Sequence, residues 1–221
     1  MLVVRSHMAR FSSYVTDTMF APHMSEFTKA EVPDVLKEID NHESWLSMFL
    51  LNSVLRSRYT GKTYQFAYNF LRRSEGVCRE YELARKQTAI FLEGSRQSIS
   101  LYSRAIQHWE YFLSHGWHSF LLLSSFAGHP RNAIFKKGDG SVDEKLNGLY
   151  SLSKHAESQI ENGHIPDTHT IPIWLENDGL RSVRYNLSFG EARDIVMLMA
   201  QWANRIVDPL KLQEMLKNGE I

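Results

Sequence analysis

The chain has a single cysteine and no long apolar run, and both absences narrow what it can be. Cys78 has no second cysteine to pair with, so an intrachain disulfide is excluded and a reducing, cytoplasmic setting is expected. Cys78 falls inside a helical pattern and is interpreted as a core residue. No apolar stretch approaches the roughly 20 residues that a membrane-spanning helix needs, so we expect no membrane partner.

The chain also lacks an excess of either charge. Lysine plus arginine and aspartate plus glutamate each number 25 among 221 residues. This balance removes bulk electrostatics as support for a nucleic-acid partner, although it leaves room for a local basic patch. An apolar fraction of 43% is ordinary for a globular protein. Residues 1–8 look like a remnant tag or disordered start, so 9–221 are treated as one domain.

Catalytic signatures are equally scarce. Thr60-Gly61-Lys62-Thr63 ends like a phosphate-binding loop, but Arg56 stands where that loop needs its first glycine. Glu161 and His164 form one Glu-x-x-His match, whereas a ferritin-like dimetal site needs the motif on two helices. No Gly-x-Ser-x-Gly motif marks a nucleophilic serine. We therefore expect no cofactor and no resident metal, and whether the protein is an enzyme stays open.

Hydrophobic periodicity predicts an all-α fold, a bundle of about five helices. Capping-box sequences begin at Thr28, Ser141 and Ser188. Gly76 interrupts the second helix and is expected to weaken or kink it. The long third helix is expected at the centre, and an ordered loop over 163–187, with short extended pieces near 171–174 and 183–187, precedes the last helix. The predicted helices cover about 32–57, 63–92, 97–126, 141–162 and 189–210.

A polar stripe follows the long helix, at steps of four, three, four and three residues: Arg104, His108, Tyr111, His115 and His118. At helical spacing it points away from the apolar stripe of the same helix. Imidazoles can move protons near neutral pH, and arginine can hold a phosphate in a fork. The alternatives are a solvated face or a contact with another helix or subunit.

A second candidate set lies on the next helix. Tyr150 and Lys154 are i,i+4 neighbours, and His155 follows directly. These three side chains are candidate binding residues. The alternative is an ordinary helix whose later half is cationic, as the helix dipole favours.

The predicted bundle, the Lys154–His155 pair and the Arg104/His108 stripe together resemble the HEPN (higher eukaryotes and prokaryotes nucleotide-binding) superfamily, over about residues 33–210. The resemblance implies an all-α, often dimeric protein of a bacterial defence or toxin–antitoxin setting. Active members cut RNA with an Arg-x4–6-His motif at a dimer cleft. Here only three residues separate Arg104 from His108, and no histidine follows Arg131 at the required distance. This departure favours a binding member over a nuclease.

Three hypotheses follow. The first is a HEPN-like bundle that binds RNA, a nucleotide or a protein partner, as a homodimer. The second is a metal-independent ribonuclease that uses Arg104 and His108 as catalytic residues, assisted by His115 or His155. The third is a metalloprotein in which His115 and His118 are ligands, since residues three apart share a helix face.

Overall fold

The computed structural model describes residues 26–56, 61–94, 98–129, 134–165, 171–208, 210, 211, 214, 217 and 218. These residues are mostly helical, which confirms the all-α prediction, and their only sheet is small. No helix in this part of the chain is long and apolar enough to cross a membrane. The proposed tag at 1–8 lies outside the described residues.

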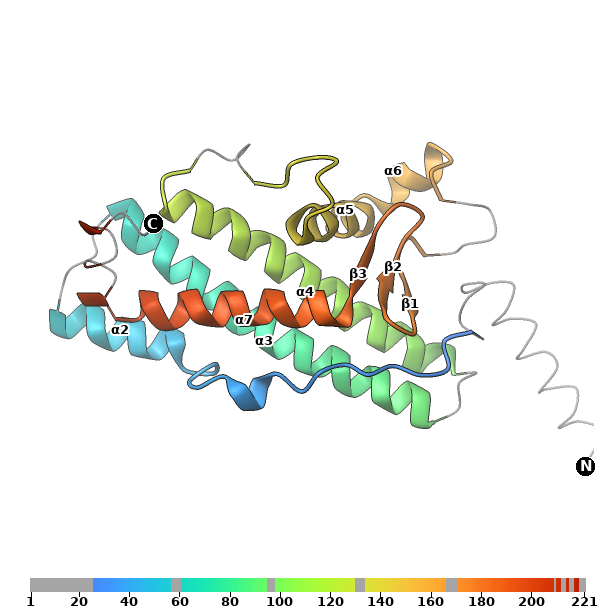
Figure 1. Ribbon diagram of the computed structural model, residues 1–221, viewed down its shortest axis with the longest axis horizontal. Helices are drawn as coiled ribbons and strands as arrows, with labels where there is room; N and C mark the ends of the chain where they lie inside the picture. Colours follow the sequence, from blue (N-terminus) through green and yellow to red (C-terminus); the bar gives the residue numbers. More distant parts are fainter. Residues whose placement is uncertain are drawn as a thin grey trace, which may run out of the picture.

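Two long antiparallel helices form the centre of the molecule (Figure 1). They are α3 (Gly61–Glu93) and α4 (Ile99–Phe126), and both match their predicted ranges. Gly76 does not interrupt α3, which continues through this residue as one helix. The last helix, α7 (Phe189–Ile206), packs along α3 and ends earlier than predicted.

Aromatic side chains fill the core between these helices. Trp109 is fully buried, and its ring meets Tyr81 edge-on at 5.7 Å between centroids. Its indole Nε1 donates to Thr88 Oγ1 at 3.2 Å, so burial leaves that donor satisfied. Burying one such side chain contributes on the order of 3 kcal/mol. The α4 positions facing this core are Tyr102, Ala105, Ile106, Trp109, Phe112 and Leu113.

The predicted helix over 32–57 is wrong in its first half. The chain there is irregular, with a short 3-10 helix, η1 (Leu36–Glu38), and a turn over 40–44, and the helix α2 starts only at Trp45 (Trp45–Arg56). Asn41 adopts a left-handed backbone with φ of 61°, which stops helical continuation. The amide of Leu46, in the first turn of α2, donates to Glu75 Oε1 of α3 at 2.7 Å.

The capping box expected at Thr28 is also wrong, because no helix begins there. The amides of Thr28 and Lys29 instead donate to Asn177 Oδ1 at 3.0 and 3.2 Å. Phe27 is buried against Phe91, whose ring is stacked at 5.8 Å. Packing of an extended segment on α3 therefore overrides the local helical signal.

The predicted helix over 141–162 is two helices, α5 (Val142–Lys154) and α6 (Ala156–Glu161). His155 breaks them apart with φ of −118° and ψ of 35°. Gly163, with φ of 66°, closes the segment near the predicted stop.

An antiparallel sheet lies in the region predicted as a loop with extended pieces. Its strands are β1 (Trp174–Glu176), β2 (Gly179–Arg181) and β3 (Asn186–Ser188), in the order β1-β2-β3. The middle strand was not predicted. The amide of Leu175 donates to the Tyr102 hydroxyl of α4 at 2.9 Å, which fixes the sheet against the bundle.

Candidate functional site

The helices α3, α4 and α5 share a polar surface on the side of α4 away from its apolar core. We call it the three-helix polar face. The antiparallel packing of α3 on α4, and of α5 on α4, brings its members together. It comprises Arg72, Arg73 and Glu80 of α3, His108, Glu110, Tyr111, His115 and His118 of α4, and Tyr150, Ser153 and Lys154 of α5.

His108 is held by a buried carboxylate. Its Nδ1 lies 2.8 Å from Glu80 Oε2, and Glu80 is only 6% exposed. The other carboxylate oxygen accepts from Arg79 Nε at 3.1 Å. A carboxylate at Nδ1 fixes the orientation of the ring and leaves Nε2 as the nitrogen that a ligand can reach. Arg104, one turn earlier, is exposed, and no ion pair joins it to another described residue.

His115 sits directly on the backbone of α3. A Cβ added to Gly76 would lie 2.8 Å from His115 Cγ and closer still to other ring atoms, so only glycine leaves room for the imidazole. His115 Nδ1 is buried and has no hydrogen-bond partner in the described part of the chain. Burial, followed by the charge of Arg73, lowers the pKa of His115 to about 4. The ring is therefore neutral at physiological pH.

His118 and Tyr150 join α4 to α5. Their rings lie 5.8 Å apart, and Lys154 Nζ lies 5.8 Å from the Tyr150 ring centroid. His118 Nδ1 donates to the Ser114 carbonyl at 2.7 Å, which leaves Nε2 as an acceptor in the neutral ring. Burial, with repulsion from Arg73 and nearby cations, lowers the pKa of His118.

Arg73 is a partly buried charge of the face. Its side chain is half-buried, yet none of the described carboxylates pairs with it. Burial and then the adjacent charge of Arg72 lower the pKa of Arg73, while Tyr150 opposes that shift. A partly desolvated guanidinium without a counter-ion is costly in isolation and favours an incoming anion.

Glu110 is a partly buried acidic residue of the same face. Its Oε1 accepts from Ser153 Oγ at 2.7 Å, and burial raises its pKa. The sequence interpretation missed this residue, together with Arg72, Arg73 and Glu80. The adjacent arginines Arg72 and Arg73 on the predicted 63–92 helix were the available signal, but the direction in which they face depends on the register of α3 against α4.

Not every predicted residue joins the face closely. Tyr111 is 48% exposed, and its hydroxyl accepts from Gln107 Nε2 at 3.2 Å on the same helix. His155 lies exposed at the break between α5 and α6. The structure therefore brings His115, His118, Tyr150 and Lys154 together and leaves His155 outside the cluster.

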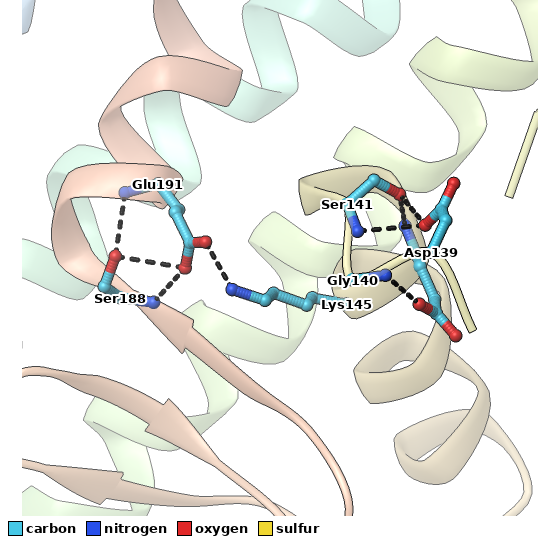
Figure 2. A network of polar contacts seen from close by, with 7 residues as sticks. Asp139, Gly140, Ser141, Lys145, Ser188 and Glu191 are labelled. Atoms are coloured by element: carbon cyan, nitrogen blue, oxygen red, sulfur yellow. Dashed lines mark hydrogen bonds and ion pairs between the residues drawn. The ribbon is translucent and has the colours of Figure 1, made fainter. Parts of the chain in front are cut away.

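Two networks hold α5 in its place beside the face (Figure 2). Ser188 and Glu191 form a reciprocal capping box at the start of α7, and Lys145 Nζ of α5 lies 2.5 Å from Glu191 Oε1. Ser141 caps α5, and the amide of Gly140 donates to Glu144 Oε2 at 2.7 Å. Lys145 is thereby committed to an ion pair, whereas Lys154 remains open to a ligand.

A metal centre finds little support in this part of the molecule. No group of three histidine, cysteine, aspartate or glutamate side chains is placed to hold a metal ion among the described residues. His115 Nδ1 is enclosed against Gly76, and His118 Nδ1 is used by Ser114. The pair lacks the third ligand that a zinc site requires.

The chain matches no family model, no curated protein and no solved structure.

Proposed function

We propose that this protein is a HEPN-like helical-bundle binding protein that engages RNA or a nucleotide through phosphate contacts on the three-helix polar face. The observation that carries the proposal is Arg73, a half-buried guanidinium without a carboxylate partner among the described residues. Arg72 and Lys154 add charge beside it, and the Tyr150 ring offers an aromatic surface for a base. Arginine forks and aromatic stacking are how proteins hold nucleotides.

The test compares RNA binding by the wild type and by an Arg72→Gln/Arg73→Gln double variant in a gel-shift titration. We expect the double variant to bind about tenfold or more weakly, the loss typical of removing charged phosphate contacts. Arg193→Gln is the matched control, because Arg193 lies on α7 and pairs with Glu38 and Asp194. The proposal would be contradicted if the wild type bound neither RNA nor a nucleotide, or if the Arg72→Gln/Arg73→Gln variant bound RNA as tightly as the Arg193→Gln control.

A metal-independent ribonuclease is the second candidate, and the Glu80–His108 pair favours it. An imidazole oriented by a buried carboxylate can accept or donate a proton at Nε2. In this ribonuclease hypothesis Arg104, on the same face, stabilises the phosphate at which the RNA is cut. Cleavage of mixed RNA by the wild type, lost in both His108→Ala and Glu80→Gln, would support it. Equal cleavage by wild type and His108→Ala, or none by either, would exclude this assignment.

We propose further that the protein is a homodimer. The outer face of α2 exposes Leu51, Val54 and Leu55 at 60%, 82% and 71%. Exposed apolar stripes on a helix commonly mark contacts with another chain, and a two-fold dimer pairs a surface with itself. Light scattering of the purified protein tests the point, and a monomer at all accessible concentrations would contradict it.

A further inference from the structure

Three cations converge at one end of the three-helix polar face. Arg72 and Arg73 come from α3 and Lys154 from α5, and all three act electrostatically on His118 between them. Lys154 Nζ and the His118 ring each lie 5.8 Å from the centroid of Tyr150. The lowered pKa of His118 disfavours its charged form, so these three side chains are the main source of positive charge at this end.

Carboxylates occupy the continuation of the face along α4. Glu80 pairs with His108, and Glu110 bonds to Ser153. His108 lies ten residues from His118, or about 15 Å along a helix. Arg79, the cation beside Glu80, is already paired with it, so a phosphodiester backbone running in that direction would leave the cationic end and pass Glu110 without gaining a counter-charge.

The opposite direction is suited to the rest of a nucleotide. The centroid of the Trp117 ring lies 4.8 Å from that of Tyr150, and the Phe135 ring stacks on Trp117 at 5.9 Å. Lys136 and Lys137 follow Phe135 and are exposed. A strand could therefore leave the cationic end past aromatic and basic side chains, but only on this side.

A cationic site from which an RNA strand can continue in only one direction favours the end of that strand. We propose that Arg72, Arg73 and Lys154 bind a terminal phosphomonoester of a nucleotide or RNA, in preference to an internal phosphodiester. This inference rests on the proposed function. A monoester carries about 1.5 to 2 negative charges at pH 7, against one for a diester, and presents three oxygens to the two arginine forks.

The experiment uses calorimetric titration of the full chain with three unlabelled RNA oligonucleotides of one sequence. One carries a 5′-phosphate, one a 3′-phosphate, and one has hydroxyls at both ends. We expect at least one phosphorylated strand to bind about tenfold more tightly than the hydroxyl strand, and the favoured end identifies the source of the monoester. Adenosine 5′-monophosphate and adenosine 3′-monophosphate, each against adenosine, repeat the contrast with the smallest probes.

Variants separate the outcomes. Arg73→Gln should remove the preference for phosphorylated ends, and Lys154→Gln, at an exposed position, should reduce it even if Arg73→Gln folds poorly. Arg193→Gln should keep it. Equal affinity for all three strands would overturn the inference and leave the proposed RNA binding standing. No binding of any strand or nucleotide would overturn both.

Discussion

The two faces of α4 differ in whether the polar atoms of their large side chains have partners. On the core face, the large aromatic side chains place their polar atoms on partners. Trp109 Nε1 donates to Thr88, and the Tyr102 hydroxyl accepts from the amide of Leu175. The polar atoms of these side chains bond to other parts of the fold, so this face contributes to stability.

The polar face of the same helix leaves interactions unused. His115 Nδ1 is buried without a hydrogen-bond partner among the described residues. Arg73, on α3, lowers the pKa of His115 by its charge and has no described carboxylate as a partner. Burial raises the pKa of Glu110. Groups of this kind cost stability and cluster at functional sites. The contrast teaches that one helix can carry the core on one side and the candidate site on the other.

The largest expected effect breaks the core side. Trp109→Ala removes a fully buried indole and leaves a cavity among Tyr81, Phe112 and Phe189. We expect the free energy of unfolding to fall by about 3–5 kcal/mol. Urea denaturation measures it, with Tyr111→Ala on the polar face as the control, expected within about 0.5 kcal/mol of wild type. Similar losses in the two variants would erase the contrast between the faces.

An intermediate effect is expected where the polar face meets α3. Gly76→Ala places a methyl group against the His115 ring, so we expect a loss of about 1–3 kcal/mol, as for overpacking. In a His115→Ala background the same change should instead stabilise by up to about 1 kcal/mol, because alanine is the better helix former. Thermal or urea unfolding of the four proteins completes the double-mutant cycle. Additive effects would show that the ring does not occupy this space.

The smallest effect is a pH dependence. The folded-state pKa of His115 is about 4, below the roughly 6.5 of an unfolded chain. As pH falls from 6.5 toward 4, the unfolded state takes up a proton that the folded state refuses, so stability declines over this window. Arg73, Arg79 and His118 add to the shift, and Glu80 opposes it.

His115→Gln should make the unfolding midpoint less sensitive to pH across that window. The expected difference is about 1 kcal/mol, reduced by solvent screening of the partly exposed ring. Thermal melts of both proteins at pH 7.5, 6.5, 5.5 and 4.5 measure it. Parallel curves would mean that His115 titrates normally.

The strongly periodic helices could be predicted from the sequence, and the interrupted segments could not. α3, α4 and α7 have sustained apolar spacing, and Ser188 caps α7 as its sequence indicates. The prediction for the segment before Trp45 was wrong because tertiary contacts bury Phe27, Val35 and Ile39 while the chain there is mostly irregular. A three-residue strand such as β2 carries too few residues for a period to show.

The site was predictable on two of its three helices, because Tyr150 and Lys154 of α5 were also candidates, but nothing in the sequence showed that they lie beside the stripe of α4. The spacing of His115 and His118 follows from α4 alone, so the stripe could be read directly. Arg73 and Glu80 join it through the antiparallel register of α3, and Ser153 through that of α5. Register between helices depends on packing of both partners, which one helix's pattern does not contain.

The contact of residues 27–29 with Asn177 and Phe91 has a kinetic consequence. The amides of Thr28 and Lys29 reach an acceptor 149 and 148 positions away, whereas α3 and α4 pair across a short connection. Loop closure over so long a stretch is entropically slow, so we expect the α3–α4 hairpin to form early and the leading segment to dock last. In native-state hydrogen exchange these two amides would then open as a separate unit, ahead of α3 and α4.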